Sequence, residues 1–148
     1  MASLFADTSA LLKWYIDEAR SDDVDALFVA QSSIAISRLA GVEFCCALGR
    51  RRRNRQITGR LEKAALNLFY THQRDGNIVV LPLADTTCAE AEHLMRAYPG
   101  IGLRTLDAMH LAAAKLMRAV EFASADRIQI AAAKAMGLRV YDFSTAVR

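Results

Sequence analysis

Apolar residues along this chain follow two different spacings. Short runs that stop at a polar residue or a proline predict buried strands, whereas apolar residues three or four positions apart predict helices. The short runs predict strands at Leu4–Asp7, Ser33–Ser37, Ile78–Leu81, Phe122–Ser124 and Leu138–Tyr141. The helical spacing covers Ser9–Ile16, Val24–Gln31, Arg38–Arg53, Arg60–His72, Asp85–Tyr98, Leu106–Val120 and Arg127–Met136. One or two helices therefore separate each strand from the next.

This order of elements predicts the fold class. Short apolar strands separated by helices form a parallel sheet, and helices on both faces then bury that sheet. Thr8 or Ser9 is expected to cap the first helix, and Gly137 is expected to end the last one. The sequence contains no internal repeat and no clear linker. We therefore expect a single α/β domain over residues 1–148, with three layers (α/β/α) and a central parallel sheet.

The composition narrows the class of protein. Of the 148 residues, 53% are hydrophobic, which supplies one core and argues against global disorder. No apolar stretch approaches the roughly 20 residues that span a bilayer. Asp7 interrupts the apolar run at the N-terminus and no basic segment precedes it, so no secretory signal is predicted. A cytoplasmic protein with no membrane partner is the expectation.

The three cysteines do not form a recognisable metal or disulfide pattern. Cys45, Cys46 and Cys88 are odd in number and contain no C-x-x-C pair. We interpret them as small apolar side chains in a reducing compartment.

Four acidic residues occupy unusual positions. Asp7 ends the first apolar run and Asp126 follows another, so both lie at the carboxyl ends of predicted strands, where open α/β sheets bind ligands. Glu43 interrupts an apolar helix face, and Asp107 opens the most apolar helix of the chain. Each acid also has a structural explanation. The three aspartates can cap or neutralise helix N-termini, and Glu43 can be solvated or form a salt bridge with an arginine of its own helix.

Taken together, the four acids predict a metal site. Two carboxylates about 4 Å apart repel each other by roughly 4 kcal/mol at an effective dielectric constant of about 20. Bound protons or a divalent cation must relieve that repulsion. A set made only of carboxylates suits Mg²⁺ or Mn²⁺, which also bind phosphate oxygens, whereas zinc favours His or Cys. The pattern therefore indicates metal-assisted chemistry on a phosphate group.

Four segments of the chain match a known family in order and in spacing. They are FADTSALLKWY, ISRLAGVEFCCAL, LRTLDAMHLAAA and FASADRIQIAAAKAMGL. Through them the chain resembles a PIN domain, and specifically the VapC-type toxin ribonucleases of bacterial toxin–antitoxin pairs. The match runs over nearly the whole chain and is poorest in residues 17–32 and in the arginine-rich segment.

The resemblance implies an activity and a set of site residues. The activity is that of a Mg²⁺- or Mn²⁺-dependent endoribonuclease, which hydrolyses RNA phosphodiester bonds with a metal-activated water. The catalytic and metal-binding residues carried over by position are Asp7, Glu43, Asp107 and Asp126. Asp7 and Asp107 are the implied principal metal ligands, and Ser9 and Ser124 match supporting hydroxyl positions.

The resemblance also implies partners. They are an RNA substrate, a second copy of the chain in a homodimer, and a cognate antitoxin whose C-terminal segment blocks the acidic groove. Two other hypotheses stay open: a non-catalytic PIN-like module that binds RNA or protein, and a DNA-acting nuclease of the same fold. The presence of all four acids argues against the first of these.

A basic run follows the helix that carries Glu43. Its members are Arg50, Arg51, Arg52, Arg53 and Arg55. Consecutive helical residues face different directions, and cations are favoured at a helix C-terminus in any case. Contact with RNA phosphates is the functional hypothesis. We interpret His110, one helical turn after Asp107, as structural, and Trp14 and Tyr15 as core residues.

Overall fold

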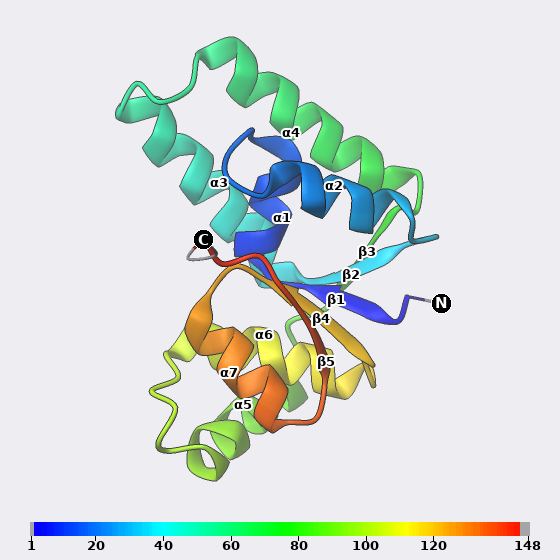
Figure 1. Cartoon of the computed structure of the whole chain (residues 1–148), viewed down its shortest axis with the longest axis vertical. Helices are drawn as coiled ribbons and strands as arrows, with labels where there is room; N and C mark the ends of the chain where they lie inside the picture. Colours follow the sequence, from blue (N-terminus) through cyan, green and yellow to red (C-terminus); the bar gives the residue numbers. More distant parts are fainter. Residues whose placement is uncertain (1, 146–148) are drawn as a thin grey trace.

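A five-stranded parallel sheet lies between two layers of helices in the computed structural model, which describes residues 2–145 (Figure 1). The strands are β1 (Leu4–Ala6), β2 (Ile34–Ser37), β3 (Ile78–Leu81), β4 (Glu121–Ser124) and β5 (Arg139–Asp142). The helices are α1 (Thr8–Tyr15), α2 (Ser21–Val29), α3 (Arg38–Arg53), α4 (Gly59–Arg74), α5 (Asp85–Ala97), α6 (Thr105–Leu116) and α7 (Arg127–Ala135). The predicted three-layer α/β/α architecture is confirmed.

Side-chain alternation along the central strand explains why helices cover both faces. Successive strand residues point to opposite faces of a sheet. Leu4 and Ala6 pack in one core with residues of α1, α2, α3 and α4, whereas Phe5 packs in a second core with α5, α6 and α7. Phe5 also stacks on Phe122 of β4, with ring centroids 5.6 Å apart. Figure 1 shows the two helical layers on either side of the sheet.

The strand order creates an opening between β1 and β4. The order in the sheet is β3-β2-β1-β4-β5, so the chain moves outward from β1 in one direction and later returns to its other side. The helix after β1 lies on one face and the helix after β4 lies on the other. Such a switch point leaves a crevice at the carboxyl ends of the two strands. Asp7 and Asp126 follow these two strands directly or closely.

Several predicted helix ends and one predicted cap differ from those observed. The helix predicted at Leu106–Val120 ends at Leu116, because Arg118 adopts a left-handed φ of 60° and the Ala119 N–H bonds back to Ala114 O at 3.0 Å. The first helix is capped by Asp7, whose side chain accepts from the backbone N–H of the third helical residue. The prediction of Thr8 or Ser9 as its cap was therefore wrong. The second helix already begins at Ser21.

Other predictions from the sequence have mixed outcomes. Gly137 ends the last helix with a φ of 85°, as expected. Cys45, Cys46 and Cys88 are free, and all three are exposed. Trp14 and Tyr15 are partly buried against the first core, as predicted. Within residues 2–145, no helix has the length and apolar character needed to cross a bilayer.

Candidate active site

Asp7 is the most deeply buried acid of the site. It caps α1 through Oδ1, which accepts the Ala10 N–H at 3.0 Å and the Ser9 hydroxyl at 2.7 Å. Its Oδ2 accepts the Ser124 hydroxyl at 2.5 Å. Burial raises the pKa of the Asp7 carboxyl above its ordinary value, although His110 and these hydrogen bonds act in the opposite direction. Burying a carboxylate is unfavourable because it loses its hydration, so a buried acid with several polar partners indicates a preorganised functional site.

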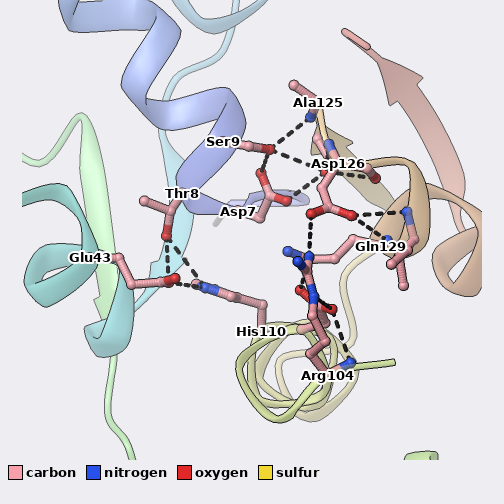
Figure 2. Close-up of polar contacts among 12 residues, drawn as sticks. Asp7, Thr8, Ser9, Glu43, Arg104, His110, Ala125, Asp126 and Gln129 are labelled. Atoms are coloured by element: carbon pink, nitrogen blue, oxygen red, sulfur yellow. Dashed lines mark hydrogen bonds and ion pairs between the residues drawn. The ribbon is translucent and has the colours of Figure 1, made fainter. Parts of the chain in front are cut away.

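Two serine hydroxyls connect Asp7 to the loop after β4. Ser9 Oγ accepts the Ala125 N–H at 2.8 Å, and Ser124 Oγ accepts the Asp126 N–H at 2.9 Å. The two hydroxyl oxygens are 3.3 Å apart. The structure therefore brings both predicted supporting serines against Asp7, and Figure 2 shows Ser9 beside it.

Asp107 and Asp126 share one arginine partner. Asp126 caps α7, its Oδ1 accepting the Ile128 and Gln129 N–H groups at 2.9 and 3.2 Å. Asp107 lies in the first turn of α6 and is nearly buried. The Arg104 guanidinium donates to Asp107 Oδ2 at 2.8 Å through Nε and to Asp126 Oδ2 at 2.6 Å through Nη2. The hydrogen bonds and charge of Asp107, reinforced by Asp126, raise the pKa of Arg104.

Glu43 is held by two side chains from other elements. Its Oε1 accepts the Thr8 hydroxyl at 2.7 Å and is hydrogen-bonded to His110 Nε2. Partial burial alone would raise the pKa of Glu43, but the bonds from His110 and Thr8 outweigh it and lower that pKa. Among residues 2–145, no arginine pairs with Glu43, so the salt-bridge explanation was wrong.

His110 and Arg104 are the side chains that sequence reasoning undervalued. His110 is buried as predicted, but its Nε2 contacts Glu43, and its Nδ1 has no partner among the residues that the structure describes. Arg104 was not singled out at all. Its position three residues before Asp107 could have predicted this ion pair, because oppositely charged side chains at this spacing meet on a helix.

The three aspartates act as helix caps or first-turn acids, and they also lie near one another at one end of the sheet. Asp7 and Asp126 are N-caps, and Asp107 accepts the Arg104 backbone N–H at 3.0 Å in the first turn of α6. Capping explains the local position of each acid. It does not explain why the acids of α1, α6, α7 and α3 meet at the same end of the sheet.

Three of the four acids line one or both of two adjoining cavities. The first has a volume of about 410 Å³ and is lined by Glu43, Asp107 and Asp126, with Thr8, Ser9, Arg104 and His110 among their neighbours. The second has a volume of about 910 Å³ and shares Thr8, Ser9 and Glu43 with the first. Together they form a groove that leads from the acids along α1 and α3. Asp7 is fully buried and lines neither cavity, but it is hydrogen-bonded to Ser9, which lines both.

The basic run contributes unequally to this groove. Arg50 and Arg51 line the larger cavity, and Arg51 also pairs with Glu18 at 2.9 Å. Arg52, Arg53 and Arg55 are exposed and are not among the residues that line it. The expectation that the run faces several directions is therefore confirmed.

The donor chemistry of the site fits a hard divalent cation, although its side chains are engaged with one another. Carboxylates and hydroxyls are the ligands that Mg²⁺ and Mn²⁺ prefer. In the described part of the chain, no three His, Cys, Asp or Glu side chains converge closely enough to hold an ion. The hydrogen bonds explain this: Glu43 faces His110, and Arg104 lies between Asp107 and Asp126.

The family model of the PIN domain matches residues 4–135. The chain therefore belongs to the PIN domain family, and the resemblance noted in the sequence is confirmed at that level. A search of curated proteins finds no significant match.

Several solved structures share the fold. VapC20 of Mycobacterium tuberculosis, described as a Sarcin–Ricin loop cleaving toxin, aligns with a TM-score of 0.70 at 17% identity, over 92% of this chain and 96% of that chain. FitAcB of Neisseria gonorrhoeae aligns with a TM-score of 0.67 at 14% identity, over 94% and 96%. VapBC2 of Rickettsia felis, bound to a DNA fragment from its promoter, aligns with a TM-score of 0.62 at 11% identity, over 95% and 98%.

Proposed function

We propose that this protein is a Mg²⁺- or Mn²⁺-dependent endoribonuclease that acts as the toxin of a type II toxin–antitoxin pair. One observation supports the proposal: in this PIN domain, Glu43, Asp107 and Asp126 line one cavity, and the buried Asp7 is hydrogen-bonded to Ser9 of the same lining. The similarity to VapC20, described as a Sarcin–Ricin loop cleaving toxin, supports the choice of an RNA substrate.

The site residues divide into ligands and the groups that orient them. Asp7 and Asp107 would hold the cation, with Glu43 and Asp126 completing the site. Ser9 and Ser124 orient the Asp7 carboxylate through the bonds they donate to its two oxygens. A bound Mg²⁺ or Mn²⁺ would activate a water for attack on phosphorus and offset the charge on the phosphate oxygens.

Thr8 and His110 orient the fourth acid. Both contact the same oxygen of Glu43, so the other oxygen of that carboxylate has no partner among the described residues. Glu43 lines both cavities, and its lowered pKa keeps it ionised at neutral pH. An ionised, oriented carboxylate at this position can bind a cation or accept a proton from water.

The groove beside the acids suits an extended, negatively charged ligand. Arg50 and Arg51 line it, and their guanidinium groups match phosphate oxygens in charge and geometry. We propose that RNA follows this groove to the acids. In the inhibited state, the C-terminal segment of an antitoxin would occupy the same groove.

A homodimer is also part of the proposal. The edge strand β3 leaves Val79 exposed, and Val42 and Tyr70 nearby are exposed around an apolar cavity of about 380 Å³. Exposed apolar surface beside an unpaired strand edge is a common association site. We infer that a second copy of the chain covers this face.

The proposed activity can be tested with purified, antitoxin-free protein. Total RNA and a matched DNA pool are incubated with Mg²⁺, Mn²⁺ or EDTA, beside the Asp107→Asn variant. Discrete RNA fragments that need the metal and disappear with Asp107→Asn are expected. Cleavage of the DNA pool alone would show that the protein is a DNA nuclease and not a ribonuclease. No cleavage of either pool by folded wild-type protein would contradict the nuclease function.

A further inference from the structure

The Arg104 guanidinium lies between two of the four acids. It contacts both oxygens of Asp107, through Nε to Oδ2 at 2.8 Å and Nη2 to Oδ1 at 3.3 Å, and it reaches Asp126 Oδ2 at 2.6 Å (Figure 2). Asp107 and Asp126 both line the smaller cavity, and their carboxylate oxygens are the atoms that a divalent cation would bind. The guanidinium and a cation therefore require the same oxygens.

Backbone N–H groups anchor the two carboxylates, whereas the arginine side chain is largely exposed. Asp126 is held by two backbone N–H groups of α7, and Asp107 accepts the Arg104 backbone N–H at 3.0 Å. The side chain of Asp107 is only 6% exposed, but that of Arg104 is 62% exposed. Among residues 2–145, the Arg104 side chain hydrogen-bonds only to these two acids. Rotation of one exposed side chain would thus release both carboxylates without disturbing α6 or α7.

We propose that Arg104 is the internal counter-ion of the metal-free site and competes with the divalent cation for Asp107 and Asp126. This inference rests on the proposed metal-dependent function. Without metal, the guanidinium relieves the repulsion between the two acids, as a cation would. Metal binding must first break these ion pairs, so Arg104 weakens metal affinity while it stabilises the metal-free fold.

The test compares wild type with Arg104→Gln and with Arg60→Gln as a charge-matched control. Arg60 is exposed on α4 and lines neither cavity of the site. Mn²⁺ affinity is measured by isothermal titration calorimetry, and Tm is measured in EDTA and in excess Mn²⁺. Neither readout depends on RNA cleavage.

Opposite shifts in the two measurements are expected for Arg104→Gln. Its Kd for Mn²⁺ should fall by about three- to tenfold, because partly exposed ion pairs of this kind are worth up to about 1 kcal/mol each. Its Tm in EDTA should lie below that of wild type, and excess Mn²⁺ should close the gap. Arg60→Gln should match wild type in both measurements.

Other outcomes separate this inference from the proposed function. If Arg104→Gln binds Mn²⁺ as tightly as wild type or more weakly, Arg104 does not compete with the cation, although the proposed metal site is still supported. An unchanged Tm in EDTA would also overturn it, because Arg104 would then not be the counter-ion. Failure of folded wild type and both variants to bind Mn²⁺ would overturn the competition together with the proposed metal dependence.

Discussion

Replacement of Asp7 separates its role as a cap from its role as a charge. Asp7→Asn keeps an oxygen that can accept the Ala10 N–H and the Ser9 hydroxyl, and it removes a fully buried negative charge. Asp7→Ala removes every acceptor. It loses a helix cap, which costs about 1 kcal/mol, and it leaves the buried Ser124 hydroxyl without its acceptor, which costs about 1–3 kcal/mol more.

The two variants should therefore differ clearly in metal-free stability. We expect Asp7→Ala to lose about 2–4 kcal/mol of unfolding free energy. Asp7→Asn should stay within about 1 kcal/mol of wild type or exceed it, because desolvation of the charge is relieved. Urea denaturation in EDTA measures both values. Neither variant should cleave RNA.

The pH dependence gives an independent check on the buried charge. Because burial raises the pKa of Asp7 above its ordinary value of 3.8, the folded state binds this proton more tightly than the unfolded state does. Wild type therefore loses stability from Asp7 as pH rises from the unfolded pKa through the raised folded pKa. Asp7→Asn lacks this loss, so its stability relative to wild type should increase over that interval and then level off.

Two results would refute this reasoning. Equal destabilisation by Asp7→Asn and Asp7→Ala would mean that the negative charge itself stabilises the metal-free fold. A relative stability of Asp7→Asn that falls as pH rises would mean that the carboxylate is favoured, not penalised, by its surroundings. Either outcome would contradict the assignment of burial as the dominant influence on Asp7.

Three further predictions concern the groove, the fourth acid and the dimer. Arg51→Ser should make the negative slope of log Kobs against log salt for single-stranded RNA less steep by about 0.7, whereas Arg53→Ser, outside the groove, should leave it unchanged. If filter binding gives the same slope for Arg51→Ser as for wild type, Arg51 does not contact RNA. His110→Leu should reduce the initial cleavage rate by about tenfold or more because Glu43 loses its orienting donor. His110→Gln, which retains an N–H, should recover much of that rate, and equal losses would argue for packing alone. Val42→Asp should convert the dimer to monomer in light scattering, and an unchanged mass would move the interface elsewhere.

Local patterns in the sequence were sufficient for the order of the elements and for the positions of two acids at strand ends. The third helix and the third strand begin and end where the apolar spacing predicts, at Arg38–Arg53 and Ile78–Leu81. Asp7 and Asp126 could be placed at strand ends because an apolar run that stops at an acid is a feature of neighbouring residues. The end of α6 was missed because a left-handed residue at Arg118, which is not glycine, leaves little trace in composition.

The partners of the acids were decided only by tertiary structure. Glu43 and His110 are 67 positions apart, and Arg104 and Asp126 are 22 apart. Such pairs meet because strand order and helix packing bring α3, α6 and the loop after β4 together at the carboxyl ends of the central strands. The sequence by itself determined which acids are available, since strand periodicity and capping are properties of adjacent residues. Which of them face a cavity, which are buried, and which are neutralised by Arg104 depends on contacts between distant segments, and only the packed fold fixes those.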